Sequence, residues 1–212
     1  MSRGGRPARE RFTTALTAEI RSFRIGAGVR FDTLYLGGGT PSLLEPEQLE
    51  AILAAARAAL PLDPEAFVVL EANPEDVAPA ALDAWRGLGV RGLSLGVQSF
   101  HDGVLRFLGR RHGAARARRA VELSLGAGFD WVSLDLIYGS PADGPVRGRG
   151  HGGHATSSRA AEAGPPGASW DPEEVALADV DAAASLGPHH LSCYQLTVHQ
   201  GTAFERARDR GR

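Results

Sequence analysis

Hydrophobic positions along the chain follow two patterns that alternate from one end to the other. Short apolar runs that end in glycine, amide or carboxylate residues predict buried strands, and apolar residues spaced three or four apart predict helices. The predicted strands cover residues 33–36, 67–70, 92–97, 131–137 and 190–197. The predicted helices cover residues 9–24, 47–60, 79–88, 101–108, 114–125 and 171–186, with a charged helical end at 204–212.

This alternation predicts an α/β fold with parallel strands and helices packed outside the sheet. Because the strands read as continuous apolar runs, we expect them to be buried. Five strands make an open sheet or part of a barrel, because a closed eight-unit barrel needs about 250 residues and this chain has 212. We therefore predict a single domain over residues 1–212.

Residues 142–168 interrupt the pattern. Gly, Pro, Ala, Ser, Arg and His dominate this segment, which has almost no aliphatic side chains. Such a segment cannot bury enough apolar surface to offset the entropy of ordering its backbone. We predict a disordered insertion within the domain. Order is expected to resume at Trp170, before a helix that Asp171 or Ser169 caps and Gly187 ends.

The composition limits the binding partners and the cellular compartment that we expect for this protein. The net charge is −2, from 23 basic and 25 acidic residues, which gives no argument for nucleic acid or an anionic membrane as a partner. No apolar run approaches the roughly 20 residues that span a bilayer. The arginine-rich start also lacks the apolar core of a signal peptide. We therefore expect a cytoplasmic protein without a transmembrane segment.

The single cysteine, Cys193, limits the metal chemistry. It excludes an intramolecular disulfide and a cysteine-rich metal site made from this chain alone, so we predict no metal ligands. Because Cys193 lies within a predicted strand, we expect it to be a small buried core residue. Arg116, Arg118 and Arg119 lie on an alanine-rich helix, where we expect a solvated face.

The first predicted strand runs into three glycines, Gly37, Gly38 and Gly39, and then Thr40. Glycines accept positive φ angles and let a ligand approach main-chain N–H groups, since no Cβ atom stands in the way. A tight strand-to-helix turn without a ligand would use the same residues. The turn is neither a dinucleotide fingerprint nor a Walker loop, because GxGxxG and GKS or GKT are absent.

Polar residues also occur at or near the carboxyl ends of the other predicted strands. They are Glu71, Asn73, Gln98, Ser99, Asp135, Tyr194, Gln195 and Thr197, and Arg110 follows the third strand through a short helix. A single polar residue there is usually a cap or a satisfied turn, but parallel strand ends converge on one rim, where such folds bind ligands. This set suits a polar zwitterion with hydroxyls and an amine, such as a nucleoside joined to an amino acid. No nucleophile–base pair is evident, so hydrolysis is poorly supported and no catalytic residue is assigned.

Six ordered segments carry a family resemblance. They read GGGTPSLL from Gly37, EANP from Glu71, GVQSF from Gly96, LGRRH from Leu108, DLIYG from Asp135 and LSCYQLT from Leu191. These segments resemble the radical S-adenosylmethionine proteins related to oxygen-independent coproporphyrinogen III oxidase, and are closer to the HemW branch of heme chaperones than to the true oxidases. The resemblance covers about residues 31–204 apart from the insertion. It implies a partial (β/α) radical-SAM barrel of parallel strands with outer helices.

The resemblance implies that S-adenosylmethionine is the cofactor and that heme and a heme-acceptor protein are further partners. By resemblance, the cofactor-binding residues are Gly38, Gly39, Thr40, Glu71, Gln98, Arg110 and Asp135. The first three would contact the methionine part, and Thr197 falls where a residue near the adenine would sit. Arg110 can pair with the carboxylate of the ligand, and Asp135 or Glu71 can hold ribose hydroxyls.

The sequence departs from the family at both ends. Family members begin with a strand carrying CxxxCxxC, whose three thiolates hold a [4Fe–4S] cluster, and this sequence has neither that strand nor those cysteines. One thiolate cannot hold a cubane cluster. The C-terminal region of the family is also missing after Arg212. We therefore expect a truncated domain that lacks its first strand, and a truncated gene product, a misplaced start and a degenerate paralogue stay open as its origin.

We interpret the chain as the S-adenosylmethionine-binding half of a HemW-like heme chaperone. Two alternatives stay open at this point: a true coproporphyrinogen III dehydrogenase of porphyrin biosynthesis, and a non-catalytic protein that binds heme or S-adenosylmethionine. Because the cluster cysteines are missing, the sequence leaves open whether the chain is an enzyme.

Overall fold

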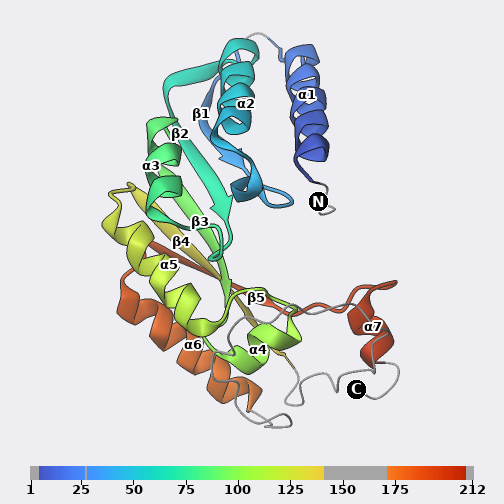
Figure 1. Cartoon of the computed structure of the whole chain (residues 1–212), viewed down its shortest axis with the longest axis vertical. Helices are drawn as coiled ribbons and strands as arrows, with labels where there is room; N and C mark the ends of the chain where they lie inside the picture. The colour runs from blue at the N-terminus through green and yellow to red at the C-terminus, as the bar shows by residue number, and fades with distance from the viewer. Residues whose placement is uncertain (1–4, 27, 141–170, 209–212) are drawn as a thin grey trace.

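A computed structural model of the chain describes residues 5–26, 28–140 and 171–208 (Figure 1). The predicted insertion at 142–168 and residues 209–212 of the predicted helical end lie outside the described residues. Within the described part, no helix is long and apolar enough to cross a membrane.

Five strands form one sheet, and their order in space is their order in the sequence. Every neighbouring pair runs parallel. The strands are β1 (Phe31–Leu36), β2 (Leu62–Ala72), β3 (Gly92–Gln98), β4 (Trp131–Tyr138) and β5 (His190–Gln195). The sheet curls into a half-barrel (Figure 1), which confirms the predicted α/β class and the partial barrel.

Most of the helices lie along the convex side of the half-barrel, in the order in which the chain forms them (Figure 1). The long helices are α1 (Arg6–Ser22), α2 (Pro46–Ala59), α3 (Pro79–Gly87), α5 (Ala114–Gly126) and α6 (Pro172–Leu186). The short ones are η1 (Pro41–Leu43) after β1, α4 (Asp102–Phe107) after β3, and α7 (Ala203–Arg208). α1 packs on α2, outside the sheet.

The two faces of the sheet differ in chemistry because successive side chains of a strand point to opposite sides. On the convex face, strand residues join the helices in the hydrophobic core, among them Val68, Leu70, Leu93, Leu95, Val132, Leu134 and Leu136. The concave face carries polar side chains instead, with Glu71, Ser94 and Ser133 in register across β2, β3 and β4. The prediction of buried strands holds for β3 and for most of β4 on both faces, but the strand residues that join the helices in the apolar core lie on the convex face.

The edge strands are more exposed than their sequences predict. In the described part of the chain, β1 pairs only with β2 and β5 only with β4. Tyr35 on β1 is 50% exposed and Tyr194 on β5 is 55% exposed. Cys193 is exposed on β5. The prediction that Cys193 is a buried core residue is wrong, because β5 is an edge strand with one neighbouring strand among the described residues, and most of its side chains are exposed.

The ends of α6 agree with the prediction. The Asp171 carboxylate accepts hydrogen bonds from the backbone N–H groups of Glu173 at 2.8 Å and Glu174 at 3.1 Å. These bonds satisfy two of the N–H groups that a helix start leaves without a partner. Gly187 ends the helix with a φ angle of 72°, a conformation that glycine adopts at low cost.

Candidate cofactor-binding site

The polar ends of the strands meet in one hollow of about 190 Å³ at the carboxyl ends of β1 to β4. Its lining residues are Gly39, Thr40, Pro41, Glu71, Ala72, Asn73, Ser94, Gly96, Gln98, Arg110 and Asp135. The structure thus brings six of the seven predicted site residues to one place. The seventh, Gly38, adjoins the hollow, because its N–H donates a hydrogen bond of 3.0 Å to Glu71 Oε2.

The glycine turn after β1 lets Glu71 lie close to the backbone. Gly38 and Gly39 have φ angles of 77° and 94°, which side chains rarely permit. Gly37 has a different constraint: a Cβ atom there would lie 2.7 Å from Glu71 Oε1 and 2.7 Å from Tyr35 Cε1. The three glycines therefore serve two purposes, since one accommodates the Glu71 carboxylate and two form the turn.

Gln98 ends β3 in an unusual backbone conformation. Its φ angle is 70°, and it is the one non-glycine residue with a positive φ angle among the described residues. Such a conformation costs about 1–3 kcal/mol and persists only where the surrounding structure imposes it. Gly96 leaves room for the Gln98 amide, because a Cβ atom at position 96 would lie 2.9 Å from Gln98 Nε2. The surrounding structure therefore holds the buried Gln98 side chain against the hollow.

Arg110 supplies the positive charge of the hollow. Burial lowers the pKa of its guanidinium, while the charges of Glu75 and Asp135 oppose that change. Within the described residues, the guanidinium donates no hydrogen bond, although it lines the hollow together with two carboxylates. A half-buried arginine with unused donors is suited to an anionic ligand group such as a carboxylate.

Asp135 lies on the concave face of β4. Burial raises the pKa of its carboxyl group, hydrogen bonds from Ser192 and Ser94 lower it, and the Glu71 charge raises it again. The Ser94 hydroxyl lies 3.3 Å from Asp135 Oδ2. Neither serine was singled out in the sequence, because Ser94 and Ser192 sit within strand patterns and their shared face becomes visible only once the strand register is known.

The loop between β2 and α3 is held by residues that sequence reasoning missed. The Ser42 hydroxyl donates a hydrogen bond of 2.7 Å to Asp76 Oδ2. Arg116 donates to the backbone oxygens of Pro74, Glu75 and Val77 at 3.0, 3.2 and 2.6 Å. Placing Arg116 on a solvated face was therefore wrong: its side chain reaches from α5 to this loop and fixes the segment that follows Glu71 and Asn73.

Comparison with known proteins decides the family. The sequence profile described as the Radical SAM superfamily matches residues 2–144. The chain belongs to the radical SAM superfamily. It is 36% identical over 177 residues to the heme chaperone HemW of Escherichia coli strain K12, which covers 84% of this chain and 39% of that protein. It is 35% identical to HemW of Mycobacterium tuberculosis strain H37Rv, covering 95% of this chain and 45% of the relative.

The fold agrees with this assignment. The structure of HemN, the coproporphyrinogen III oxidase of Escherichia coli described as a radical SAM enzyme, superposes with a TM-score of 0.71 at 24% identity. The match covers 95% of this chain and 40% of HemN. The chain spans less than half the length of these relatives. The resemblance inferred from the sequence is thus confirmed at the level of a HemW- or HemN-like radical SAM protein.

The residues of this radical SAM chain fit one family cofactor better than the other. The backbone of the glycine turn, two carboxylates and an arginine that donates no hydrogen bond to a described residue fit S-adenosylmethionine. No group of three or more His, Cys, Asp or Glu side chains among the described residues could hold a metal ion. Cys193 pairs in register with the core residue Leu136, so it lies on the convex face and away from Asp135. The described residues therefore do not fit an iron–sulfur cluster.

Thr197 does not join the hollow. Its hydroxyl lies 3.4 Å from the backbone oxygen of Gln195, just beyond β5. It is absent from the residues that line the hollow. Its predicted place near the adenine stays a prediction.

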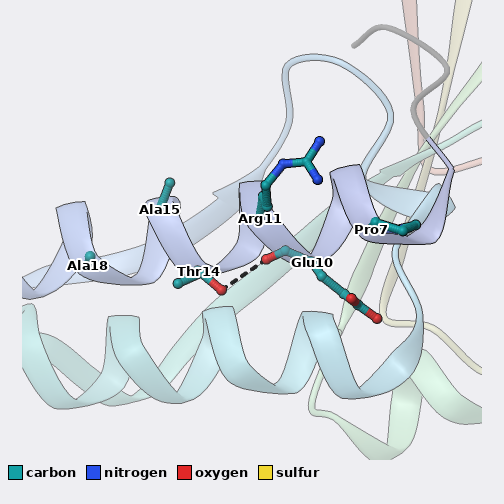
Figure 2. Close-up of a pocket in the computed structure, with 6 residues that line it drawn as sticks. All are labelled: Pro7, Glu10, Arg11, Thr14, Ala15 and Ala18. Carbon is teal, nitrogen blue, oxygen red and sulfur yellow. Dashed lines mark hydrogen bonds between the residues drawn. The ribbon is translucent and has the colours of Figure 1, made fainter.

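A second hollow lies on α1 (Figure 2). It is lined by Pro7, Glu10, Arg11, Thr14, Ala15 and Ala18, all from this one helix. The Thr14 hydroxyl donates to the backbone oxygen of Glu10 at 3.0 Å, as the dashed line in Figure 2 shows. All of these residues come from one helix, and they do not bring several hydrogen-bond donors to one point. This hollow therefore lacks the set of charged and polar groups that lines the hollow at the strand ends.

The raised pKa of Asp135 gives a prediction for the ligand-free protein. An acid whose pKa is higher in the folded state binds more protons there, so stability falls as pH rises from 3.8, the ordinary value, through the folded pKa. Replacing Asp135 with asparagine is expected to reduce this fall and to raise the stability at neutral pH by less than about 1 kcal/mol, since solvent screens part of the effect. Thermal unfolding at several pH values measures it.

The matched control is Asp181→Asn, which removes the same charge from an exposed position on α6. It is expected to leave the pH profile unchanged. An Asp135→Asn protein that is less stable than the parent across the whole pH range would contradict the claim that burial disfavours the charged carboxylate.

Proposed function

We propose that this chain is the S-adenosylmethionine-binding half of a HemW-like radical SAM protein. The observation that supports the proposal most directly is the convergence of Arg110, Glu71 and Asp135 with Gly39 and Thr40 in one hollow, which Gly38 adjoins through its hydrogen bond to Glu71. Each group comes from a different strand end or loop. Ligand recognition explains their juxtaposition better than folding stability does, because burial disfavours the charged forms of Asp135 and Arg110 in the ligand-free protein.

Each residue has a role that its chemistry supports. Arg110 pairs with the carboxylate of the methionine part, and the Thr40 hydroxyl and the backbone of the glycine turn bind the amino-acid end. Asp135 and Glu71 accept hydrogen bonds from hydroxyls of the ribose. Gln98 offers an amide that donates no hydrogen bond to any described residue. Bound S-adenosylmethionine would supply the sulfonium group, and these residues would bind and orient it.

The hollow is smaller than the ligand requires. A pocket that buries most of a ligand of this size usually measures about 300 Å³ or more, and the described residues enclose about 190 Å³. We propose that the rest of the ligand lies over the concave face, where Tyr35 and Ser94 flank Glu71 and Asp135. The ligand would therefore be bound in part on an open surface, and its affinity would be moderate.

The cluster and heme are separate parts of the proposal. Because one thiolate cannot hold a cubane cluster and the sequence contains one cysteine, we propose that this chain cannot bind a [4Fe–4S] cluster with its own thiolates. Binding of heme, and its transfer to an acceptor protein, is proposed from the similarity to proteins named heme chaperone HemW.

Equilibrium dialysis of the purified chain against labelled S-adenosylmethionine tests the main proposal. We expect saturable binding of one molecule per chain, and competition by S-adenosylhomocysteine, which keeps the carboxylate and the ribose. A folded chain that binds neither compound would refute the proposed function. Anaerobic reconstitution with iron and sulfide tests the cluster claim, which a stable cubane absorbance spectrum would contradict, and a hemin titration tests the heme part separately.

A further inference from the structure

The side chain of His112 is fully buried, and both of its ring nitrogens have hydrogen-bond partners in the protein. Its side chain is 0% exposed. Nδ1 lies 2.9 Å from Glu75 Oε2, and Nε2 lies 3.1 Å from the backbone oxygen of Val97. His112 follows Arg110 by two positions and precedes α5. Its partners come from the loop after β2 and from β3, so three separate segments of the chain meet at one imidazole ring.

Counting protons defines the charge of this ring. A carbonyl oxygen can only accept a hydrogen bond, so Nε2 must carry a proton and donate to Val97. An ionised carboxylate can also only accept, so Nδ1 must carry a second proton when Glu75 is charged. The hydrogen bond from His112 lowers the pKa of Glu75, and the charges of His112 and Arg110 lower it further. The geometry therefore fits an imidazolium that donates two hydrogen bonds.

The partners of His112 are neighbours of the site residues. Val97 immediately precedes Gln98, whose φ angle of 70° needs support from its surroundings. Glu75 lies two residues after Asn73, which lines the hollow, and its charge acts on Arg110. One buried ring thus connects the backbone before Gln98, the loop after Glu71 and the segment that carries Arg110.

We propose that His112 and Glu75 form a buried imidazolium–carboxylate pair that positions Gln98 and Arg110 for the ligand. The pair is a positioning device, because neither residue lines the hollow. The part of the proposal that concerns the ligand rests on the proposed function, whereas the charge of the pair and its hold on the backbone do not.

The surrounding charges are consistent with this pair. Arg110 faces Glu75 from the loop before α5. Arg116 reaches from α5 and donates to the backbone oxygen of Glu75. Asp76, the next acid along the loop, is engaged by the Ser42 hydroxyl. Glu75 is therefore the carboxylate that neutralises the ring, and removing one partner of such a buried pair leaves an uncompensated charge or an unsatisfied donor.

Nuclear magnetic resonance of the ligand-free chain tests the charge directly. The protein is labelled with ¹⁵N in its histidines, and the ring signals of His112 are assigned from their loss in His112→Ala. We expect both ring nitrogens to be protonated at neutral pH in the parent, and one in Glu75→Gln, whose amide can donate to Nδ1 of a neutral ring. A single protonated nitrogen in the parent would overturn the imidazolium–carboxylate pair.

Hydrogen exchange of the same ligand-free proteins tests the positioning role. Glu75→Ala is expected to speed exchange of the backbone amides at 98–101 and 110 by about tenfold or more, while the amides of α2 and β2 keep their rates. Glu122→Gln, at an exposed position of α5, is the control and should change neither region. A uniform increase over the whole chain would mean a purely structural role and would overturn the proposal.

Affinity for S-adenosylmethionine completes the test. We expect His112→Ala and Glu75→Ala to weaken binding by about tenfold or more, because a small displacement of binding groups has a large effect, and Glu75→Gln to stay within about threefold of the parent. If His112 acts through Arg110, the effects of the two substitutions overlap. The affinity of the double variant Arg110→Ala/His112→Ala is then at most about twofold below the affinity of whichever single variant binds more weakly. Independent, multiplicative losses would contradict positioning. A parent chain that does not bind S-adenosylmethionine refutes the proposed function instead. The two experiments on the ligand-free protein then still decide whether His112 and Glu75 form the charged pair that holds the backbone.

Discussion

Replacing Arg110 with alanine is expected to weaken the binding of S-adenosylmethionine by roughly 30- to 100-fold. A hydrogen bond to a charged group contributes about 1.5–3 kcal/mol, and each 1.4 kcal/mol corresponds to about a tenfold change in affinity. In the ligand-free chain the guanidinium makes no hydrogen bond to a described residue, so its donors are available to the ligand. Burial disfavours its charge, and pairing with a carboxylate would offset that cost. Calorimetric titration measures the change.

Arg119→Ala is the matched control for this variant. Arg119 lies on the neighbouring helix α5, its side chain is 62% exposed, and it pairs with Glu122 at 3.4 Å across one turn. Losing such a surface pair changes stability by well under about 1 kcal/mol, and it should leave the affinity for the ligand unchanged. Equal affinity of Arg110→Ala and the parent would remove Arg110 from the proposed site, even if the chain binds the ligand.

Replacing Leu134 with alanine is expected to lower the free energy of unfolding by about 3 kcal/mol. Leu134 is 0% exposed on the convex face of β4 and belongs to the core between the sheet and the helices. Removing its side chain loses apolar burial and leaves a cavity, because the neighbouring strands β3 and β5 are fixed by their register. Urea denaturation followed by circular dichroism measures the loss.

Leu177→Ala makes the same chemical change at an exposed site. Leu177 lies on α6 and is 62% exposed. We expect a change within about 0.5 kcal/mol, which is usual for surface positions. Similar losses for both leucines would contradict the assignment of Leu134 to the packed core between the sheet and the helices.

The candidate site was predictable to a large extent because its residues occupy the ends of strands. Glycine, carboxylate and amide residues after apolar runs mark those ends in the sequence, and parallel strands bring their carboxyl ends together. All seven predicted residues lie in or beside one hollow. Arg110 lies farther from its strand than the other residues do, since a helix separates it from β3, and the family resemblance implied its role in the same site.

The supporting residues were not predictable in the same way. His112, Ser42 and Arg116 act on segments that lie 15 to 42 positions away in the sequence. A single histidine after two arginines, or an arginine on an alanine-rich helix, has many ordinary explanations. Their roles depend on which loops approach each other, and that is a property of long-range packing.

Local patterns along the chain were enough to establish the order of strands and helices, the α/β class and the set of residues at the strand ends. Each of these depends on interactions between near neighbours in the sequence, such as the periodicity of apolar positions and the chemistry of turns. The exposure of Cys193, the polar concave face and the buried contacts of His112 depend instead on how a curled sheet distributes its two faces and edges. Successive side chains of a strand lie on opposite faces of the sheet, but which face is convex and which is concave is decided only when the five parallel strands have paired in register. The surroundings of each residue therefore follow only from the assembled half-barrel.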